Sequence, residues 1–154
     1  MKFIHTADIH LGAEPDAGSS YSTERPEELW NSFERLLDVC EEEQTDLLLI
    51  AGDLFHRQPL RKELKELDYL FSRLTHTQVV LMAGNHDYLK STSYYRNYPW
   101  QGPVHMFLSQ RPACMEFAEI GTCVYGLSYE QREITQSLYD AVRPQKRQPV
   151  EILL

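Results

Sequence analysis

Side chains that can bind metal ions are grouped at three places in the sequence, each just after a short apolar run. They belong to Asp8, His10, Asp53, Asn85, His86 and Asp87. Asp8 and His10 are separated by one residue, so an extended backbone would point both side chains to the same side. Carboxylates, imidazole and an amide oxygen suit Mn²⁺, Fe or Zn²⁺ better than a thiolate site would. The sequence therefore predicts a metal centre with mixed oxygen and nitrogen ligands.

Three short apolar runs come before these polar residues and must position them. The runs cover residues 2–7, 47–51 and 79–83, and a glycine follows each of the last two. Short apolar runs bounded by glycine are typical of strands buried on both faces of a parallel sheet. Between them, apolar residues recur at helical spacing over 26–40 and 60–74. This order predicts two βαβ units, whose functional sites form at the carboxyl ends of the strands.

The remainder of the chain predicts a second sheet that begins after residue 103. Its expected strands cover residues 104–108, 115–117, 122–127 and 150–154. A helix is expected over 130–142, and the tyrosine-rich stretch 88–102 is expected to form a loop or a short helix. We therefore expect an α/β fold, a layered sandwich whose mostly parallel first sheet is flanked by helices. If the chain forms only half of such a sandwich, apolar surface of its sheet is exposed, which predicts a homodimer or poor solubility.

Composition argues against several classes of protein. The 154 residues are 42% hydrophobic and 11% aromatic, which is too much for a disordered chain. A net charge of −8 argues against a simple electrostatic clamp on nucleic acid, but bound metal ions could supply positive charge to phosphates. Three cysteines without a C-x-x-C pair favour a reducing cytoplasm over a disulfide framework or a structural zinc site. No apolar run approaches the length of a membrane helix.

Three motifs together resemble those of a known family. Asp8-Ile9-His10-Leu11-Gly12, Gly52-Asp53-Leu54-Phe55-His56 and Gly84-Asn85-His86-Asp87 are similar, in order and spacing, to the first three motifs of the calcineurin-like metallophosphoesterases. The opening residues 3–12 and the second motif are especially similar to the DNA repair exonuclease branch, which includes SbcD-like and YhaO-like proteins. The resemblance is strongest over residues 1–89. It implies a layered αββα sandwich, of which this chain would be the N-terminal half.

The resemblance implies two divalent metal ions, with Mn²⁺ as the first expectation and Fe, Zn²⁺ or Mg²⁺ as alternatives. Asp8 and His10 would hold the first ion, Asp53 would bridge both, and Asn85 would hold the second. A bridging hydroxide would attack phosphorus in line, while the ions offset charge on the phosphate oxygens.

Three further residues receive roles from the same resemblance. His86 would protonate the leaving oxygen or stabilise the transition state, and Asp87 would orient its ring. His56 would lie at the rim of the site and face the substrate. Simpler alternatives stay open for two of the ligands, because Asp53 could cap a helix and Asn85 could form a turn.

The family completes its metal site with three further histidines, one after a later strand and two in a G-H-x-H motif. No such motif occurs in these 154 residues. We therefore expect residues 1–154 to be the N-terminal part of a nuclease domain, truncated before the C-terminal histidine motifs. Such a piece is expected to bind metal weakly and to show little activity by itself.

The expected function is metal-dependent phosphodiester hydrolysis by a Mn²⁺-dependent DNA exonuclease or its nuclease subunit. DNA is the expected substrate, and the resemblance implies an ATPase partner of the structural-maintenance (SMC) type, bound through a region beyond Leu154. Two alternatives stay open: a metallophosphoesterase for small or cyclic phosphodiesters or phosphoproteins, and an inactive fragment. The aromatic residues within 88–100 could stack on unpaired bases or pack their loop over the core.

Overall fold

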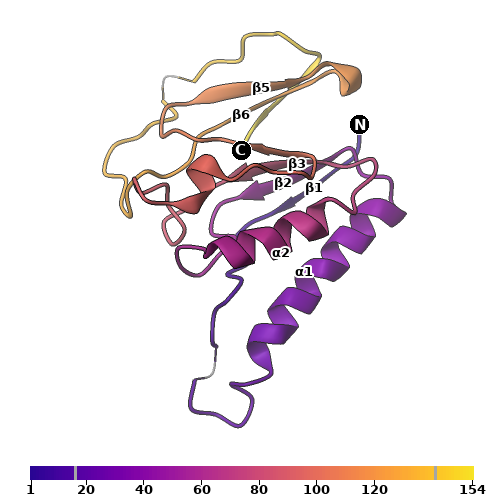
Figure 1. Cartoon of the computed structure of the whole chain (residues 1–154). Coiled ribbons are helices and arrows are strands. Elements are labelled where there is room, and N and C mark those ends of the chain that lie inside the picture. The colour runs from indigo at the N-terminus through magenta and orange to yellow at the C-terminus, as the bar shows by residue number, and fades with distance from the viewer. Residues whose placement is uncertain (16, 141) are drawn as a thin grey trace.

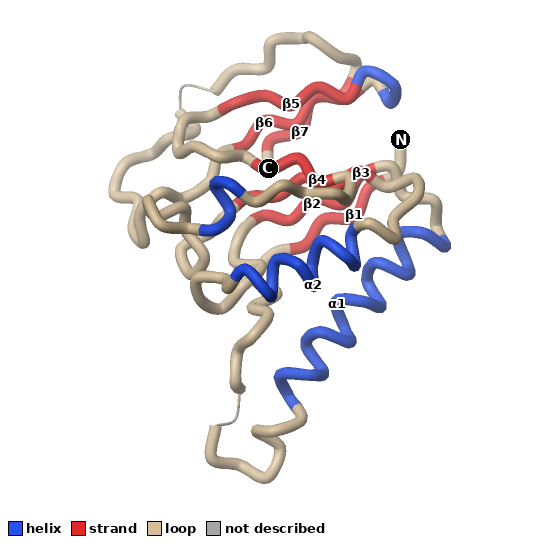
Figure 2. Tube along the Cα trace, viewed as in Figure 1, coloured by secondary structure: helices blue, strands red, loops and turns tan. Residues whose placement is uncertain are grey.

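Two β-sheets lie face to face, and two helices cover the outer face of one of them (Figures 1 and 2). This computed structural model describes residues 1–15, 17–140 and 142–154. The first sheet contains β1 (Phe3–Thr6), β2 (Leu47–Ala51), β3 (Gln78–Met82) and β4 (Val104–Met106). The second contains β5 (Ala113–Phe117), β6 (Thr122–Gly126) and β7 (Val150–Leu153). The helices are α1 (Arg25–Glu42) and α2 (Arg61–Phe71), and the 3₁₀ turns are η1 (Tyr94–Asn97) and η2 (Ala118–Ile120).

The first sheet is entirely parallel, and its strands follow chain order, β1-β2-β3-β4. His5 is opposite Leu49, and Leu49 is opposite Val80, so the strands that precede the polar motifs end at the same edge. The helices α1 and α2 lie on the same face of the sheet (Figures 1 and 2), as right-handed crossovers between strands added in chain order require. The two βαβ units are confirmed, but the helices flank only one face.

Alternation along the central strand β2 divides the core in two. Leu48 and Ile50 pack in a cluster with the helices, whereas Leu47 and Leu49 pack in a second cluster with Val124 of β6. Successive side chains of a strand point to opposite faces, so a strand that is covered on both sides is apolar at every position. Each fully buried leucine or isoleucine contributes about 1.5–3 kcal/mol. The second sheet thus covers the face that the helices leave open.

The second sheet begins at Ala113 and not directly after residue 103. Residues 104–106, which the pattern predicts as part of the second sheet, instead add to the free edge of β3, with Leu81 opposite Met106. The second sheet is mixed, because β6 is antiparallel to β5 and parallel to β7. A short apolar strand suits either sheet, so the sequence pattern alone does not assign it to one of them.

No helix forms over the described residues 130–140 and 142, which corrects the helix predicted for 130–142. Ile134 and Leu138 are only partly buried there, and Tyr139 donates its hydroxyl to the carbonyl of Leu154 at 2.9 Å. Short helices are stable chiefly through the packing of an apolar face. The few apolar residues of this segment do not provide such a face.

Apolar side chains are exposed on two edge strands. Phe3 on β1 is 48% exposed, and Val150 and Leu153 on β7 are 38% and 57% exposed. The expected exposure of apolar sheet surface is therefore found at these edges, and a dimer that covers it stays a prediction.

Within the part of the chain that the structure describes, no helix is long and apolar enough to cross a membrane.

Candidate metal centre

The loops that follow β1 and β2 run side by side beyond the end of the first sheet. The His10 amide donates to the carbonyl of Asp53 at 3.0 Å, and the Leu11 amide donates to the carbonyl of Leu54 at 2.8 Å. The loop after β3 joins them through the His86 amide, which donates to Oδ1 of Asp53 at 2.8 Å. Hydrogen bonds therefore bring the three polar motifs together at one edge of the sheet, where the strand ends predict a site.

Three of the predicted ligands have a left-handed backbone. The φ angles of Asp8, His10 and Asp53 are 53°, 54° and 48°, and only two other non-glycine residues of the described chain have a positive φ. This conformation costs an L-residue about 1–2 kcal/mol, although aspartate and histidine adopt it more readily than most. Such strain is concentrated at functional sites. The extended backbone predicted for Asp8 and His10 is therefore wrong, yet their side chains still meet.

Asp8, His10 and Asp53 can contact one ion together. One ligand atom of each lies within 4.8 Å of the others, and Nε2 of His10 is 3.9 Å from Oδ1 of Asp8. Asp8 is exposed, whereas Asp53 is buried. Two carboxylates and an imidazole form a donor set that Mn²⁺, Fe and Zn²⁺ accept, so these residues fit the predicted kind of metal. Asn85 is half-buried at the start of the third loop, next to His86 in the chain.

Gly52 and Gly84 let the second and third loops approach each other closely. Gly52 has a φ of 91°, which favours glycine. A Cβ atom on Gly84 would lie 2.6 Å from the amide nitrogen and 2.7 Å from Cγ of Asp53, well inside van der Waals contact. Asp53 does not cap α2, because the N-cap of that helix is Leu60. Asp53 can occupy this position only because Gly84 has no Cβ atom.

Asp87 is fully buried and links the loops. Its Oδ1 accepts a hydrogen bond from the Gly84 amide at 2.8 Å, and its Oδ2 accepts from the Phe55 amide at 3.2 Å and the Tyr95 hydroxyl at 3.0 Å. Desolvation raises the pKa of Asp87 to about 6, although the three donors act in the opposite direction. Asp87 therefore ties together the second loop, the third loop and η1.

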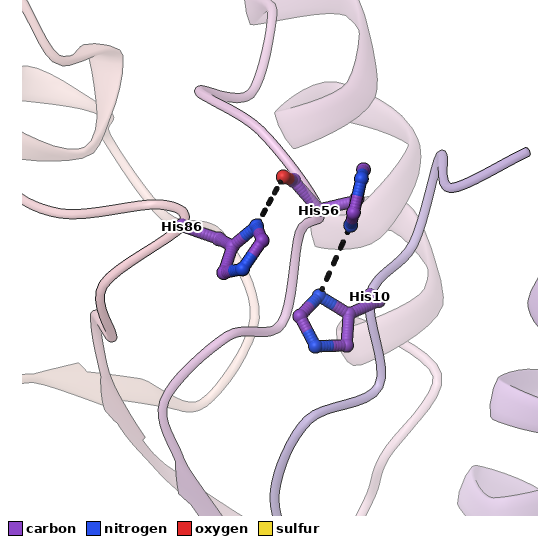
Figure 3. A group of neighbouring side chains, drawn as sticks. All are labelled: His10, His56 and His86. Carbon is purple, nitrogen blue, oxygen red and sulfur yellow. Dashed lines mark hydrogen bonds between the residues drawn. The ribbon is translucent and has the colours of Figure 1, made fainter. Parts of the chain in front are cut away.

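The His86 ring is oriented by a backbone carbonyl and not by Asp87. Nδ1 of His86 is 2.8 Å from the carbonyl oxygen of His56 (Figure 3). A carbonyl only accepts hydrogen bonds, so Nδ1 carries the proton and Nε2 has the lone pair in the neutral ring. The contact predicted between Asp87 and this ring is replaced by the one with His56, because both Asp87 oxygens bond to other groups.

Tyr95→Phe is expected to lower the free energy of unfolding by about 1–3 kcal/mol, because Asp87 loses one donor while it stays buried. Urea unfolding measures this change. Tyr94→Phe is the matched control, since it removes the same atom from an exposed neighbour and should change the stability by no more than about 0.5 kcal/mol. Equal losses in the two variants would contradict the stabilising role of the bond between Tyr95 and Asp87.

Three imidazole rings, those of His10, His56 and His86, face one another at this edge of the sheet (Figure 3). Their centroids are 4.8–5.3 Å apart, and the two Nδ1 atoms of His10 and His56 are separated by 3.4 Å. Desolvation lowers the pKa of His56, and positive charge on His86 and His10 would lower it further. His56 is exposed, as its predicted place at the rim requires.

The site opens into a surface hollow of about 510 Å³. Asp8, His10, His56 and His86 line one part of it, and Leu29 of α1 lines another. A phosphate group that entered this hollow would meet carboxylate, imidazole and apolar side chains together. Pockets of this size and mixed lining are typical of small-ligand sites.

The aromatic residues after the third motif pack their loop over the core. Tyr95 is buried, and Tyr98 and Trp100 pack partly buried against the helix-side cluster, whereas Tyr94 is exposed. Packing is thus confirmed for three of these aromatics. The bond from Tyr95 to Asp87 was not predicted, since a contact between two loop residues eight positions apart leaves no periodic signal in the sequence.

The structure is thus an α/β two-sheet sandwich with a group of possible metal ligands, carboxylates and imidazoles, at its strand ends. The model of the family described as calcineurin-like phosphoesterase matches residues 1–153. The chain therefore belongs to the calcineurin-like phosphoesterase family, and the resemblance carried by the three motifs is confirmed.

Several curated proteins are similar to the chain over part of their length. The uncharacterized metallophosphoesterase YhaO of Bacillus subtilis is 31% identical over 150 residues, which cover 89% of this chain and 36% of that protein. The DNA double-strand break repair protein Mre11 of Aeropyrum pernix is 37% identical over 90 residues, 56% of this chain and 21% of that protein. SbcD, a component of the nuclease SbcCD of Bacillus subtilis, is 26% identical over 155 residues, with coverages of 91% and 38%. The chain thus spans less than two fifths of each relative.

Proposed function

We propose that this chain forms part of a Mn²⁺-dependent phosphodiester hydrolase that acts on DNA, as a cytoplasmic exonuclease or as the nuclease subunit of a DNA repair complex. The observation that most directly supports this proposal is the group formed by Asp8, His10 and Asp53. Their ligand atoms lie within 4.8 Å of one another at the strand ends of a calcineurin-like phosphoesterase. In this proposal Asp8 and His10 hold a first ion, Asp53 faces both ions, and Asn85 holds the second.

The chain's own residues would position the substrate and move the proton. When bound, the divalent ions would polarise the phosphate and increase the acidity of water. Asp53 holds the third loop in place through the His86 amide. His86 keeps Nδ1 on the carbonyl of His56 and presents Nε2, from which its protonated form would deliver a proton to the leaving oxygen. Asp87 would support that loop from inside, and His56 would face the substrate.

DNA as the substrate is supported by the relatives and is compatible with the charge of the chain. Two of the relatives are a DNA double-strand break repair protein and a component of a nuclease. Because the net charge is −8, affinity for phosphates would come from the bound ions and not from a basic surface. By the same likeness we propose an ATPase partner of the SMC type. The exposed apolar edges of β1 and β7 favour a homodimer.

The predicted ligands of this chain are too few to complete the coordination of two ions. Asp8, His10, Asp53 and Asn85 provide four protein ligands, whereas each ion takes four or more donors. We propose that further ligands come from residues outside this chain and that the 154 residues alone bind the ions weakly.

The test is hydrolysis by a polypeptide that contains this chain and extends to the length of its relatives. End-labelled duplex DNA and a chromogenic phosphodiester are offered in parallel with Mn²⁺. We expect the DNA to be trimmed, and we expect both EDTA and Asp8→Asn to stop the reaction. Asp8 is exposed, and its carboxylate accepts no hydrogen bond from the described residues, so the substitution should not disturb the fold. Turnover of the small diester alone would favour a different metallophosphoesterase. No turnover and no Mn²⁺ binding would favour an inactive scaffold.

A further inference from the structure

His10 presents its two ring nitrogens to two different sets of side chains. Nε2 faces Asp8, 3.9 Å from Oδ1, whereas Nδ1 faces His56, 3.4 Å from Nδ1 of that ring. Ligand atoms of His10, His56 and His86 also lie within 4.8 Å of one another. His10 is therefore shared between a set rich in carboxylates and a set made only of imidazoles. Figure 3 shows the imidazole set.

One pair of nitrogens in the imidazole set has the spacing that a single ion requires. Two nitrogens bound to tetrahedral Zn²⁺ at about 2.0–2.1 Å are separated by about 3.3–3.4 Å. The Nδ1 atoms of His10 and His56 are 3.4 Å apart. The ring of His10 is inclined by 69° to that of His56 and by 79° to that of His86, whereas the rings of His56 and His86 are inclined by 33° to each other.

His86 can supply the third nitrogen without a change in its hydrogen bonding. Its Nδ1–H donates to the carbonyl of His56, which leaves the lone pair on Nε2. Metal-binding histidines are commonly oriented by such a bond from the second ring nitrogen to a carbonyl. All three histidines line the same hollow, which leaves room for a water molecule as a fourth ligand.

We propose that His10, His56 and His86 form a tri-imidazole site for one Zn²⁺ ion, and that this site and the centre of Asp8, His10 and Asp53 exclude each other. A neutral imidazole has one lone pair, so His10 binds an ion through only one nitrogen unless it loses its second proton. Nitrogen ligands bind Zn²⁺ more tightly than Mn²⁺. Zn²⁺ at this site would withdraw His10 from the carboxylate centre and His86 from proton transfer, so it would inhibit the enzyme. The binding site stands by itself, and only the inhibition rests on the proposed function.

Titration calorimetry with Zn²⁺ and Mn²⁺ tests the two sets of ligands. His56→Gln removes an imidazole from the tri-imidazole site and no ligand from the carboxylate centre. We expect its Zn²⁺ affinity to fall by at least about tenfold, while its Mn²⁺ affinity stays within about twofold. Asp8→Asn is the reciprocal variant and should lose Mn²⁺ affinity but keep Zn²⁺ affinity. His5→Gln removes an exposed histidine of β1 and should alter neither.

Co²⁺ provides a second readout that does not depend on activity. A tetrahedral nitrogen site should give Co²⁺ a visible absorption band in the unchanged protein and in Asp8→Asn, and this band should be lost in His56→Gln. His86→Gln removes another imidazole of the same site, and it replaces His56→Gln in both experiments if His56→Gln does not fold.

Three outcomes have separate meanings. Equal Zn²⁺ affinity in the unchanged protein, His56→Gln and His86→Gln would overturn the tri-imidazole site. Zn²⁺ bound together with a Mn²⁺ ion that is lost in Asp8→Asn would overturn the mutual exclusion. If the Zn²⁺ and Co²⁺ results hold but Mn²⁺ supports no hydrolysis in the extended polypeptide, the proposed function fails and the tri-imidazole site stands.

Discussion

Asp53→Asn is expected to abolish Mn²⁺ binding at the carboxylate centre and therefore to lower hydrolysis by at least about 10²-fold, while the fold stays intact. Asparagine tolerates the left-handed backbone of Asp53, whose φ is 48°. Its side-chain oxygen can still accept the hydrogen bond from the His86 amide. The substitution therefore removes the negative charge and keeps the shape of the ligand.

Thermal unfolding of Asp53→Asn should show two effects of different kinds. A buried carboxylate costs desolvation energy when no cation is bound, so the metal-free variant should melt at the same temperature as the unchanged protein or higher. Mn²⁺ should raise the melting temperature of the unchanged protein, because an ion that binds only the folded state stabilises it. Mn²⁺ should not raise the melting temperature of Asp53→Asn.

Asp68→Asn is the matched control for this prediction. Asp68 is a second buried carboxylate, and its Oδ1 accepts hydrogen bonds from the amides of Gln101 and Gly102. Asp68 lies outside the metal centre, so its substitution should leave the Mn²⁺-induced rise unchanged. It should lower the stability, because the amide nitrogen that replaces Oδ2 cannot accept the hydrogen bond from the Tyr98 hydroxyl. A rise that survives in Asp53→Asn would contradict the role proposed for Asp53.

Gly84→Ala is expected to destabilise the protein by about 1–3 kcal/mol and to remove Mn²⁺ affinity as well. The added Cβ would lie 2.6 Å from the Asp53 amide nitrogen, which belongs to the backbone and cannot rotate away. The Gly84 amide is also held by Oδ1 of Asp87 at 2.8 Å. The second and third loops would have to separate, and the ligands that they carry would separate with them. Urea unfolding and calorimetry with Mn²⁺ measure the two losses.

Gly102→Ala is the control that distinguishes the loss of stability from the loss of Mn²⁺ affinity. A Cβ atom on Gly102 would lie 2.9 Å from Cβ of Phe71 and 3.0 Å from the Ser72 amide nitrogen, a clash of a similar kind beside α2. This variant should lose stability and keep its Mn²⁺ affinity. If Gly84→Ala binds Mn²⁺ as well as Gly102→Ala does, close approach of the loops is not required for the metal centre.

Much of the fold follows from apolar patterning, and its exceptions have a common cause. The continuous apolar runs at 47–51 and 79–83 predict strands that are covered on both faces, and β2 and β3 are covered in that way. Which sheet residues 104–106 join depends on which surfaces are still free after the core has formed. Whether a helix forms after residue 129 depends on the same free surfaces. A local pattern holds no information about those surfaces, and the helix predicted at 130–142 is absent from the described residues 130–140 and 142.

For the site, the sequence predicts which residues meet but not how the backbone brings them together. Motif spacing correctly places Asp8, His10 and Asp53 at one edge of the sheet. The left-handed conformations of all three do not follow from residue type, and they accompany loop-to-loop hydrogen bonds that a local pattern does not specify. The orientation of His86 by the carbonyl of His56 was missed for the same reason, since any residue at position 56 would offer that carbonyl.

Because β1, β2, β3 and β4 add to their sheet in chain order, each strand pairs with residues that the ribosome has already released. Domains can fold during synthesis at about 5–20 residues per second, and contacts between neighbouring segments form before distant ones. The three ligand-bearing loops are complete at Asp87, and the first sheet is complete at Met106. The second sheet is complete only at Leu153, where β7 ends beside β6. The nascent chain could therefore capture a metal ion before its second sheet exists, and the captured ion would stabilise the half-formed protein.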